Sequence, residues 1–432
     1  YIGATATLTL PAGMELWFPD DARDLVVDGT LKALGTAADP VRFWGSNPSS
    51  SEYGGTIYFT EGSHDNVLQY ALIERMGDSS NSADAAVYAD SAAVSFVHTT
   101  ITDTQSRHLL VSARTPHLLE FEDNTIPTCH VGSGPTTVAS ATWAVPDSSY
   151  TMVNILQINY GDTLRLLPGT QIDFPNYANN IYVEGVLLVQ GEQSNRVRFF
   201  GTNPDVATVL DWGGGLYFHE SSAGSIISFA EFEKLGTPYL LNYNYGTIIT
   251  FSPNLSIQNN QFKNCLKYAV YVAQHSPVIK ENCFENMIGI SNSPAKYGVF
   301  ATAGADPVVD ATNNYWDSAD GPYNALNNPG GNPEVEATDN VLVIPYNEIC
   351  LEFIEYDLGI VQLAAPESGC ALTANEAVQI QVVNAGVSPQ SNFEVSYVFD
   401  GLEVTELVTA TIQPGQIYTH TFAGSVDLSA KD

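Results

Sequence analysis

Basic residues are scarce in this sequence. It holds 15 Lys and Arg against 48 Asp and Glu among 432 residues, which gives a formal net charge of −33 at pH 7. A surface of that sign repels phosphate backbones and anionic lipid headgroups, so we expect no nucleic-acid partner. Charged residues make up only 15% of the chain and hydrophobic residues 44%, which is typical of a folded protein rather than of a disordered acidic tail.

Long apolar runs are also missing. No stretch approaches the roughly 18 consecutive apolar residues of a membrane-spanning helix, so we expect no membrane insertion. No basic segment followed by an apolar one stands at Tyr1, where a secretion leader would lie. Together with the few lysines, these features predict a mature or trimmed piece of an exported protein, located outside the cell or on a bacterial cell surface.

Cysteine is sparse, and its count of five is odd. No CxxC pair or Cys/His cluster occurs, which argues against a zinc site. We interpret Cys129, Cys265 and Cys283 as small buried hydrophobic residues. A disulfide between Cys350 and Cys370 in an oxidising compartment is a hypothesis.

The sequence contains an internal duplication, in which residues 8–77 recur at 164–236. LVVDG at 25–29 returns as IYVEG at 181–185, and VRFWG at 41–45 returns as VRFFG at 197–201, both at an offset of 156 residues. After a three-residue insertion the offset becomes 159, where ERMG at 74–77 matches EKLG at 233–236. A constant offset over separate segments indicates one architecture used twice. It also favours a scaffold role for the equivalent residues Arg42 and Arg198.

A shorter period lies inside the halves. NQFKN at 260–264 is echoed by NCFEN at 282–286, and KYAVY at 267–271 by KYGVF at 296–300. Repeats of about 20 to 50 residues are typical of solenoids and propellers. Short β-rich bursts separated by Gly, Asn, Asp or Ser favour stacked coils of a parallel β-helix. We predict structural ladders along the stack, made by Phe262 and Phe284 and by Asn124, Asn260, Asn282 and Asn313.

Several motifs resemble those of a known family. LPAG at 10–13, LPG at 167–169, VDGTLKALG at 27–35 and NNYWDSADGP at 313–322 are similar to motifs of right-handed parallel β-helices with the pectin-lyase-like fold, in their non-catalytic secreted form. The resemblance covers residues 1–346. It implies a solenoid fold, but it does not indicate a specific function, because one fold can carry many functions.

The segment after residue 346 has a different pattern of hydrophobic and polar residues. Longer alternating strands at 377–383, 393–399 and 418–422, with turns at Asp400-Gly401 and Pro414-Gly415, predict a β-sandwich. We assign residues 347–356 to a linker and 357–432 to the sandwich. VVNAG at 382–386 and FEVSY at 393–397 resemble the bacterial cell-adhesion-related domain, an immunoglobulin-like module. The resemblance implies a large surface protein, as in Bacteroidota, and further domains after a sandwich that ends early.

Catalytic signatures of this fold are missing from the sequence. A galacturonase-like hydrolase would need paired Asp residues with Gly-His-Gly and Arg-x-Lys segments, and neither segment occurs. A lyase would need a calcium cage of carboxylates and an Arg or Lys base. We therefore favour a protein that is not an enzyme. A lyase or hydrolase acting on an acidic polysaccharide is the alternative, and a passive building block of a filament or surface layer is the third reading.

Two candidate ligand sites can be named. Five of the seven lysines fall within residues 234–296, and an acidic glycan could lie against Lys263, Lys267 and Lys296 with Tyr268, Tyr271 and Tyr297. The alternative is solvated lysines paired with acids such as Glu281 and Glu285. Calcium could bind the turn with Asp317 and Asp320, although a metal-free turn is favoured because no full ligand set recurs. We expect no other cofactor.

The sequence as a whole predicts a fragment of a large adhesive or structural protein of the cell surface. Its β-helix would present a face to a polysaccharide or a surface protein, and its sandwich would act as a spacer.

Overall fold

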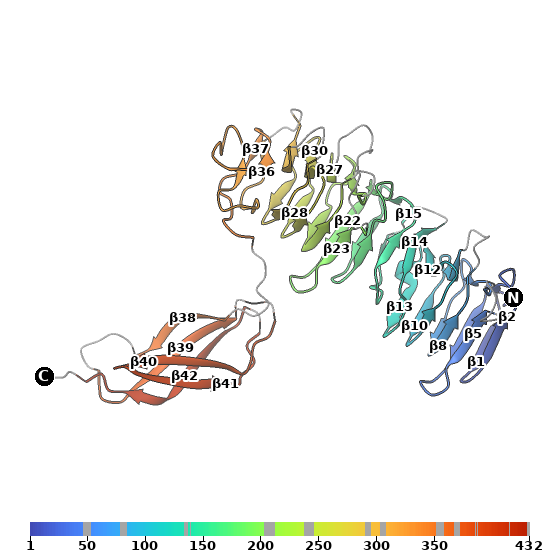
Figure 1. Cartoon of the computed structure of the whole chain (residues 1–432), viewed down its shortest axis with the longest axis horizontal. Helices are drawn as coiled ribbons and strands as arrows, with labels where there is room; N and C mark the ends of the chain where they lie inside the picture. Colours follow the sequence, from blue (N-terminus) through green and yellow to red (C-terminus); the bar gives the residue numbers. More distant parts are fainter. Residues whose placement is uncertain are drawn as a thin grey trace. The chain divides into compact units, whose positions relative to one another are not determined.

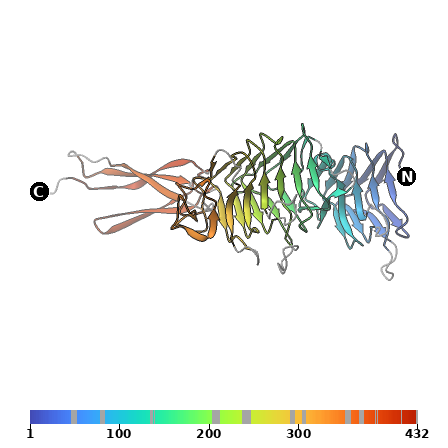
Figure 2. The same ribbon diagram turned by 90° about the horizontal axis from the view of Figure 1, so that it is seen from above.

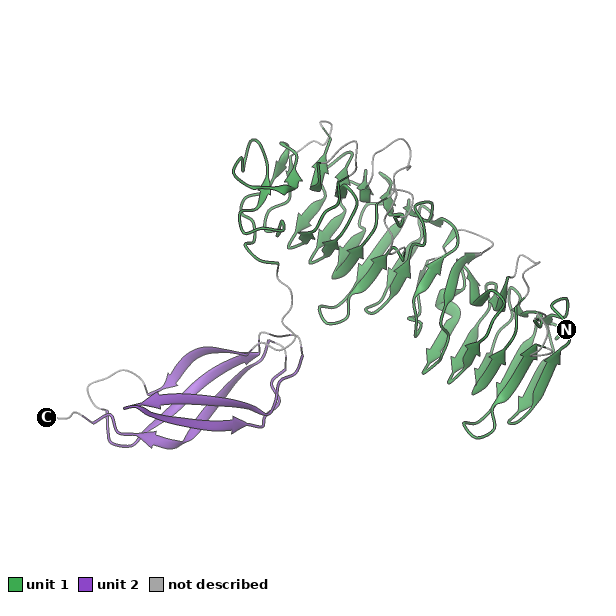
Figure 3. Cartoon of the chain, in the orientation of Figure 1, with its two compact units in different colours: residues 1–351 green, residues 352–432 purple. Residues whose placement is uncertain are grey.

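The computed structural model describes residues 1–45, 53–77, 84–133, 137–138, 140–202, 212–236, 246–289, 295–302, 308–350, 358–366, 372–384, 386, 388–413 and 415–429. Two compact units are present, unit 1 at Tyr1–Leu351 and unit 2 at Glu352–Asp432 (Figure 3). The division falls inside the segment 347–356 that the sequence assigns to a linker. Within the described ranges, no helix is long and apolar enough to span a membrane.

Unit 1 is a parallel β-solenoid, in which each coil adds one strand to each of its sheets (Figures 1 and 2). Its N-terminal part has two sheets of its own. The five-stranded sheet contains β1 (Thr7–Pro11), β4 (Thr30–Leu34), β7 (Asn66–Gln69), β10 (Val94–Val97) and β13 (Leu119–Glu122). The four-stranded sheet contains β2 (Glu15–Phe18), β5 (Val41–Gly45), β8 (Ala71–Glu74) and β11 (Thr100–Thr102). A 3-10 turn, η1 (Pro116–Leu118), precedes β13.

The longest sheet runs through both halves of unit 1. This eleven-stranded sheet contains β3 (Leu25–Val27), β6 (Ile57–Phe59), β9 (Ala85–Ala89), β12 (Arg107–Ser112), β14 (Cys129–Ser133), β17 (Tyr150–Met152), β20 (Gln171–Asp173), β23 (Val197–Phe200), β26 (Ala230–Glu233), β29 (Gln261–Lys263) and β32 (Cys283–Glu285).

The C-terminal part of unit 1 also has sheets of its own. The nine-stranded sheet contains β15 (Thr137–Val138), β18 (Leu156–Ile158), β21 (Ile181–Val183), β24 (Leu216–Phe218), β27 (Gly246–Thr250), β30 (Tyr268–Val272), β33 (Tyr297–Ala301), β36 (Asn332–Ala337) and β35 (Pro322–Tyr323). The six-stranded sheet contains β16 (Ala141–Thr142), β19 (Thr163–Leu166), β22 (Val186–Gln190), β25 (Ile226–Ser228), β28 (Ser256–Gln258) and β31 (Val278–Lys280). A short pair, β34 (Val309–Asp310) and β37 (Val341–Leu342), follows.

The strands bury alternate side chains inside the coils, as the two-residue period of a strand requires. On the eleven-stranded sheet, the inward-facing rings of Phe199, Phe232, Phe262 and Phe284 stack with centroids 5.0, 4.8 and 5.2 Å apart. Trp316 extends this stack at 4.8 Å from Phe284. The predicted pairing of Phe262 with Phe284 is therefore confirmed, and these rings form part of one continuous core.

An asparagine ladder holds the turns of the last coils. The Nδ2 groups of Asn260 and Asn282 donate to the Oδ1 atoms of Asn282 and Asn314, each at 3.0 Å. The three residues are 1% exposed or less, so the ladder satisfies buried backbone groups that water cannot reach. The prediction for Asn260 and Asn282 is confirmed. The prediction for Asn313 is wrong by one residue, because Asn313 has a φ of 60° and its neighbour Asn314 enters the coil.

Equivalent residues of the two halves make equivalent contacts. The Arg42 guanidinium lies 5.3 Å from the ring centroid of Trp44, and the Arg198 guanidinium lies 5.4 Å from that of Phe200. The ion pairs of the two arginines differ, because Arg42 pairs with Glu15 on the preceding strand β2 at 4.0 Å and Arg198 with Glu231 on the following strand β26 at 3.0 Å. These local contacts support the scaffold role expected for the two arginines.

The duplication is nevertheless out of phase with the solenoid by one strand. At the offset of 156 residues, β1, β2 and β3 correspond to β19, β20 and β21. β3 lies in the eleven-stranded sheet, but β21 lies in the nine-stranded sheet, and it is β20 that continues the eleven-stranded sheet. Equivalent surfaces of the two halves therefore belong to different sheets.

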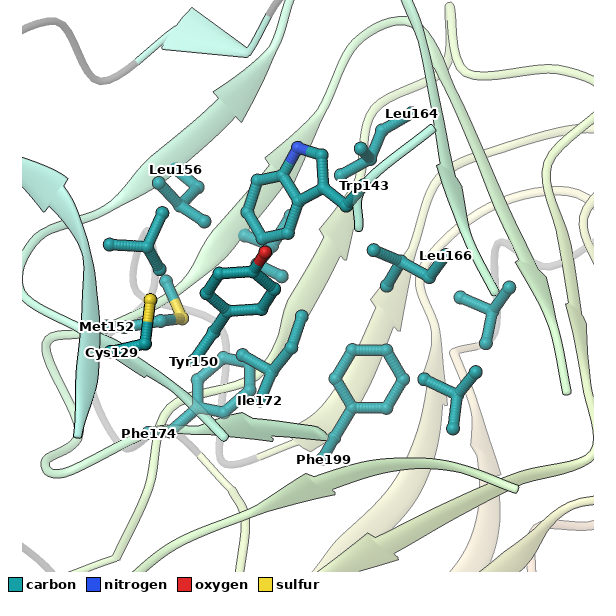
Figure 4. Close-up of a cluster of buried hydrophobic side chains, with 14 of the residues drawn as sticks. Cys129, Trp143, Tyr150, Met152, Leu156, Leu164, Leu166, Ile172, Phe174 and Phe199 are labelled. Carbon is teal, nitrogen blue, oxygen red and sulfur yellow. The ribbon is translucent and has the colours of Figure 1, made fainter. Parts of the chain in front are cut away.

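The phase changes near residues 119–142. Between β13 and β14 the chain adds only an isolated bridge, from Thr125 to Thr100, to the four-stranded sheet. Large side chains fill the coil at this junction, where Trp143 and Tyr150 are fully buried with ring centroids 5.1 Å apart (Figure 4). The Tyr150 hydroxyl donates to the Ala144 carbonyl at 3.0 Å. The core thus stays continuous through the shift.

The cysteines differ from expectation in their pairing. Cys283 and Cys350 form a disulfide with Cα atoms 5.4 Å apart, so the hypothesis that joined Cys350 to Cys370 is wrong. Cys283 is buried, as interpreted, but it is bonded rather than a simple hydrophobic residue. Cys283 occupies an outward position on β32, in register with Gln261, where the segment that leaves the solenoid can reach it. Cys370 lies outside the described residues. Cys129 and Cys265 are free and buried, as predicted, and burial raises the pKa of both thiols.

Unit 2 is an antiparallel two-sheet unit. β38 (Leu358–Ala365), β39 (Glu376–Asn384) and β42 (Ile417–Val426) form one sheet, and β40 (Phe393–Phe399) and β41 (Leu402–Val408) form the other. Alternate residues of β39, namely Val378, Ile380 and Val382, point into its own small core. Asp400 and Gly401 both have positive φ, as a two-residue hairpin turn requires. The chain is thus a parallel β-solenoid followed by a β-sandwich, as the sequence predicts.

Candidate functional site

Aromatic side chains line up on the outer face of the nine-stranded sheet. Outward positions in register on five successive strands hold the aromatic row, which consists of Tyr182, Tyr217, Ile249, Tyr271 and Phe300. Ring centroids are 5.4 Å apart for Tyr182 and Tyr217 and 5.3 Å apart for Tyr271 and Phe300. Tyr182 and Phe300 are half-buried, whereas the three members between them are buried.

Two further tyrosines join the row at its C-terminal end. Tyr268 and Tyr297 are register partners on β30 and β33, with ring centroids 5.5 Å apart. Phe300 contacts both, at 4.7 Å from Tyr268 and 5.2 Å from Tyr297. The structure therefore brings together the three tyrosines that the sequence singles out. Tyr268 and Tyr271 are buried in the cluster, so Tyr297 is the one that presents a half-exposed ring.

Two of the three predicted lysines lie at this cluster. Lys267 and Lys296 precede β30 and β33 and sit on adjacent coils, as their 29-residue spacing predicts. The Lys267 Nζ lies 4.8 Å from the Tyr268 ring centroid, and the residue is only 7% exposed. Lys296 pairs with Glu334, which lies on β36 of the same sheet.

The third lysine is elsewhere. Lys263 lies on β29 of the eleven-stranded sheet, where its Nζ is 3.8 Å from a carboxylate oxygen of Glu285. Lys280 makes a similar pair with Asp310 at 2.8 Å. The pairing of lysines with nearby acids is thus confirmed for these residues, and Lys263 is separate from the tyrosine cluster.

Burial perturbs the titratable groups of the cluster. Removal from water lowers the pKa of Lys267, and it is the main cause of the raised pKa values of Tyr268, Tyr297 and Glu336. Tyr297 also donates a hydrogen bond to the Glu336 carboxylate, its register partner on β36. Lysine, tyrosine and carboxyl groups with shifted pKa values thus converge on one outer face, an arrangement that can bind polar ligands or exchange protons.

This site has three members that the sequence does not single out, namely Glu334, Glu336 and Phe300. The alternation in NPEVEA at 332–337 could have indicated them, because Val335 is buried and its acidic neighbours face outward. Their partners across the sheet could not be found without the register, since β33 and β36 are separated by a long connection.

The turn proposed for calcium is organised by protein contacts. A carboxylate oxygen of Asp317 accepts the backbone N–H of Asn286 at 3.0 Å, and the Asp320 N–H donates to the Ser318 hydroxyl at 3.1 Å. Among the described residues, no group of three or more His, Cys, Asp or Glu side chains is placed to hold a metal ion.

Comparison with protein-family models, with curated proteins and with solved structures finds no match for this chain.

Proposed function

We propose that the chain is part of a large secreted or cell-surface protein with an adhesive or structural role. Unit 1 would be a pectin-lyase-like right-handed β-helix that binds a glycan, and unit 2 an immunoglobulin-like module of the bacterial cell-adhesion-related type that acts as a spacer. The regular solenoid supports this role, because stacked coils present rows of side chains on extended faces.

The observation that carries the proposal is the cluster at the end of the aromatic row. Tyr297 and Phe300 supply half-exposed rings that can stack against sugar rings, and Lys267 and Lys296 supply positive charge in a strongly acidic protein. The net charge of −33 repels polyanions at long range, so binding here depends on short-range contacts, in which a sugar carboxylate replaces Glu334 as the partner of Lys296.

A glycan-array screen of the whole chain tests this proposal. We expect binding to uronic-acid glycans that weakens in Lys267→Ala, Lys296→Ala and Tyr297→Ala. Lys280→Ala is the matched control, because Lys280 pairs with Asp310 on another sheet. Equal affinity in all four variants, or no binding of acidic glycans, would contradict the proposed site. Addition of EDTA during the same screen tests whether calcium takes part.

The same cluster favours one second candidate, a lyase or hydrolase that acts on an acidic polysaccharide. Burial shifts the pKa values of Lys267 and Glu336 toward neutrality, as is common for groups that transfer protons, and Tyr297 donates a hydrogen bond to Glu336. Mass spectrometry of a bound uronate oligosaccharide separates the two candidates. New unsaturated or reducing ends that disappear in Glu336→Gln would establish the enzyme, and an unchanged oligosaccharide would leave the binding role.

A further inference from the structure

A groove without charged side chains opens where the second half of unit 1 begins. Its volume is about 490 Å³, and its lining comes from two successive coils: Val153, Asn154, Ile155, Gln157, Asn176, Ala178 and Asn179. Two other grooves of the described solenoid include charged residues, Lys32 and Glu120 in one and Arg198 and Glu231 in the other. A neutral lining is therefore a distinguishing property in a chain with 48 acidic residues.

One buried acceptor in this groove has no partner in the protein. Asn179 is 3% exposed, and its side-chain oxygen makes no hydrogen bond. The adjacent Asn180 is also buried but is fully engaged, because its Oδ1 accepts the Gly215 N–H at 2.9 Å and its Nδ2 donates to the Tyr177 carbonyl at 3.1 Å. Buried polar atoms are nearly always hydrogen-bonded, so the Asn179 oxygen is an unused acceptor in the wall of the groove.

The rest of the lining suits a hydroxylated ligand with apolar faces. Gln157 adds an amide at an outward position of β18, in register with Tyr182, the first member of the aromatic row. Ile155 is 40% exposed and offers aliphatic surface. Amide groups can both donate to and accept from hydroxyl groups, and the nearby tyrosine ring can contact the C–H face of a sugar.

We propose that this amide groove binds a neutral pyranose unit of a polysaccharide. The lining has no lysine or arginine to neutralise a carboxylate or sulfate and no carboxylate to hold a cation, which favours a neutral ligand over a charged one. The inference rests on the proposed glycan-binding role of unit 1, but it concerns a different site and a different class of sugar.

The first half supports this assignment by contrast. At the offset of 156 residues, Asn176 and Asn179 correspond to Asp20 and Arg23, which form an ion pair at 3.6 Å. The same turn of the coil thus carries charges in one half and amides in the other. Of these two equivalent turns, only the one in the second half lines an uncharged groove.

Titration of the whole chain with cellohexaose, mannohexaose and hexagalacturonic acid, followed by calorimetry, tests the proposal. We expect a neutral hexasaccharide to bind, and its affinity to fall about tenfold in Asn179→Leu and in Gln157→Leu. Gln193→Leu is the matched control, because it removes an amide from the groove that contains Arg198. Asn179→Leu should also keep or raise the thermal midpoint, since it removes an unsatisfied buried atom, whereas Asn180→Leu should lower it.

Each other outcome would overturn the proposal. It fails if no neutral hexasaccharide binds, or if hexagalacturonic acid displaces the neutral hexasaccharide. It also fails if the affinity is unchanged in both Asn179→Leu and Gln157→Leu. Loss of acidic-glycan binding in Lys267→Ala reports on the tyrosine cluster instead, so the two proposals succeed or fail separately.

Discussion

The two halves of unit 1 make the same backbone contacts with different side chains. Asp24 accepts the Thr56 N–H at 2.7 Å, and its equivalent Asn180 accepts the Gly215 N–H at 2.9 Å. In the same way Asn66 accepts the Leu31 N–H, and Ser225, which replaces it in the second half, accepts the Leu187 N–H. The coil dictates where an acceptor must stand, but carboxylate, amide and hydroxyl groups can each serve.

The outer surfaces of the halves have diverged further. The positions equivalent to Tyr182 and Tyr217 hold Val26 and Tyr58 in the first half. Their row continues in register through Tyr88 and Leu110 of the eleven-stranded sheet. Because the duplication is shifted by one strand, equivalent rows do not merge into one face. The duplication has therefore preserved the backbone of the coil and left each outer face able to acquire its own ligand.

Reduction of the disulfide should give the largest difference between the halves. Cys283 and Cys350 are 67 residues apart and tie the exit of the chain to the second half only. Cross-linking a loop of that length stabilises a fold by about 4 kcal/mol in the chain-entropy model. Hydrogen exchange with and without a reductant should show lost protection near residues 278–350 and little change in residues 1–110. Equal loss of protection in both parts would contradict the expected difference between the halves. Cys265→Ala is the control, and because Cys265 is a free cysteine this variant should still respond to the reductant.

Two equivalent glycines in tight turns should separate interior from terminal coils. A Cβ on Gly185 would lie 2.3 Å from the carbonyl oxygens of Asn159 and Asp162, and one on Gly29 would lie 2.3 Å from those of Gly3 and Ala6. We expect Gly185→Ala to cost about 3 kcal/mol. Gly29→Ala should cost less, because the terminal coil can open locally without breaking the stack. Chemical denaturation of both variants measures this, and a larger cost for Gly29→Ala would contradict it.

Much of this fold can be predicted from sequence because solenoid contacts are periodic. The offsets of 22 and 29 residues correctly pair Phe262 with Phe284 and Tyr268 with Tyr297. The one-strand shift could not be predicted, because it depends on the single bridge from Thr125 to Thr100, which has no sequence signature. The sequence therefore does not predict the sheet in which a residue lies. For this reason Lys263 was wrongly grouped with Lys267 and Lys296, which lie at another sheet.

The candidate sites are harder to predict than the fold, because they also depend on this one-strand shift. The residues of the amide groove come from turns about 25 residues apart, and the equivalent turn of the first half contains Asp20 and Arg23. Neither turn has a motif, and only the burial of Asn179 without a partner distinguishes it from an ordinary loop asparagine.

The asparagine ladder should make the second half more sensitive to loss of an amide. Asn282 is fully buried; its Nδ2 donates to the carbonyls of Ile257 and Lys280, and its Oδ1 accepts from Asn260. Asn282→Ala leaves several buried groups unsatisfied and should cost about 2 kcal/mol. Asn124→Ala should cost about half as much, because Asn124 is half-exposed and water can replace its amide. Thermal or chemical unfolding of the two variants measures the ratio, and equal costs would show that the ladder adds nothing beyond single bonds.

The smallest expected effect concerns a position where the halves differ in polarity. Trp17 is 63% exposed in the first half, whereas its equivalent Asp173 is 4% exposed and accepts a hydrogen bond from the Thr202 hydroxyl at 2.9 Å. Burial raises the pKa of Asp173 above its ordinary value of 3.8, and so the folded state binds this proton more tightly than the unfolded state does. The unfolding free energy must then fall as pH rises through the folded-state pKa. Asp173→Asn has no titrating group at this position. The unfolding free energy of the variant minus that of the unsubstituted protein should therefore rise as pH rises through the folded-state pKa of Asp173, and it should be constant in stronger acid. A difference that does not vary with pH would show that Thr202 fully compensates the burial of the charge.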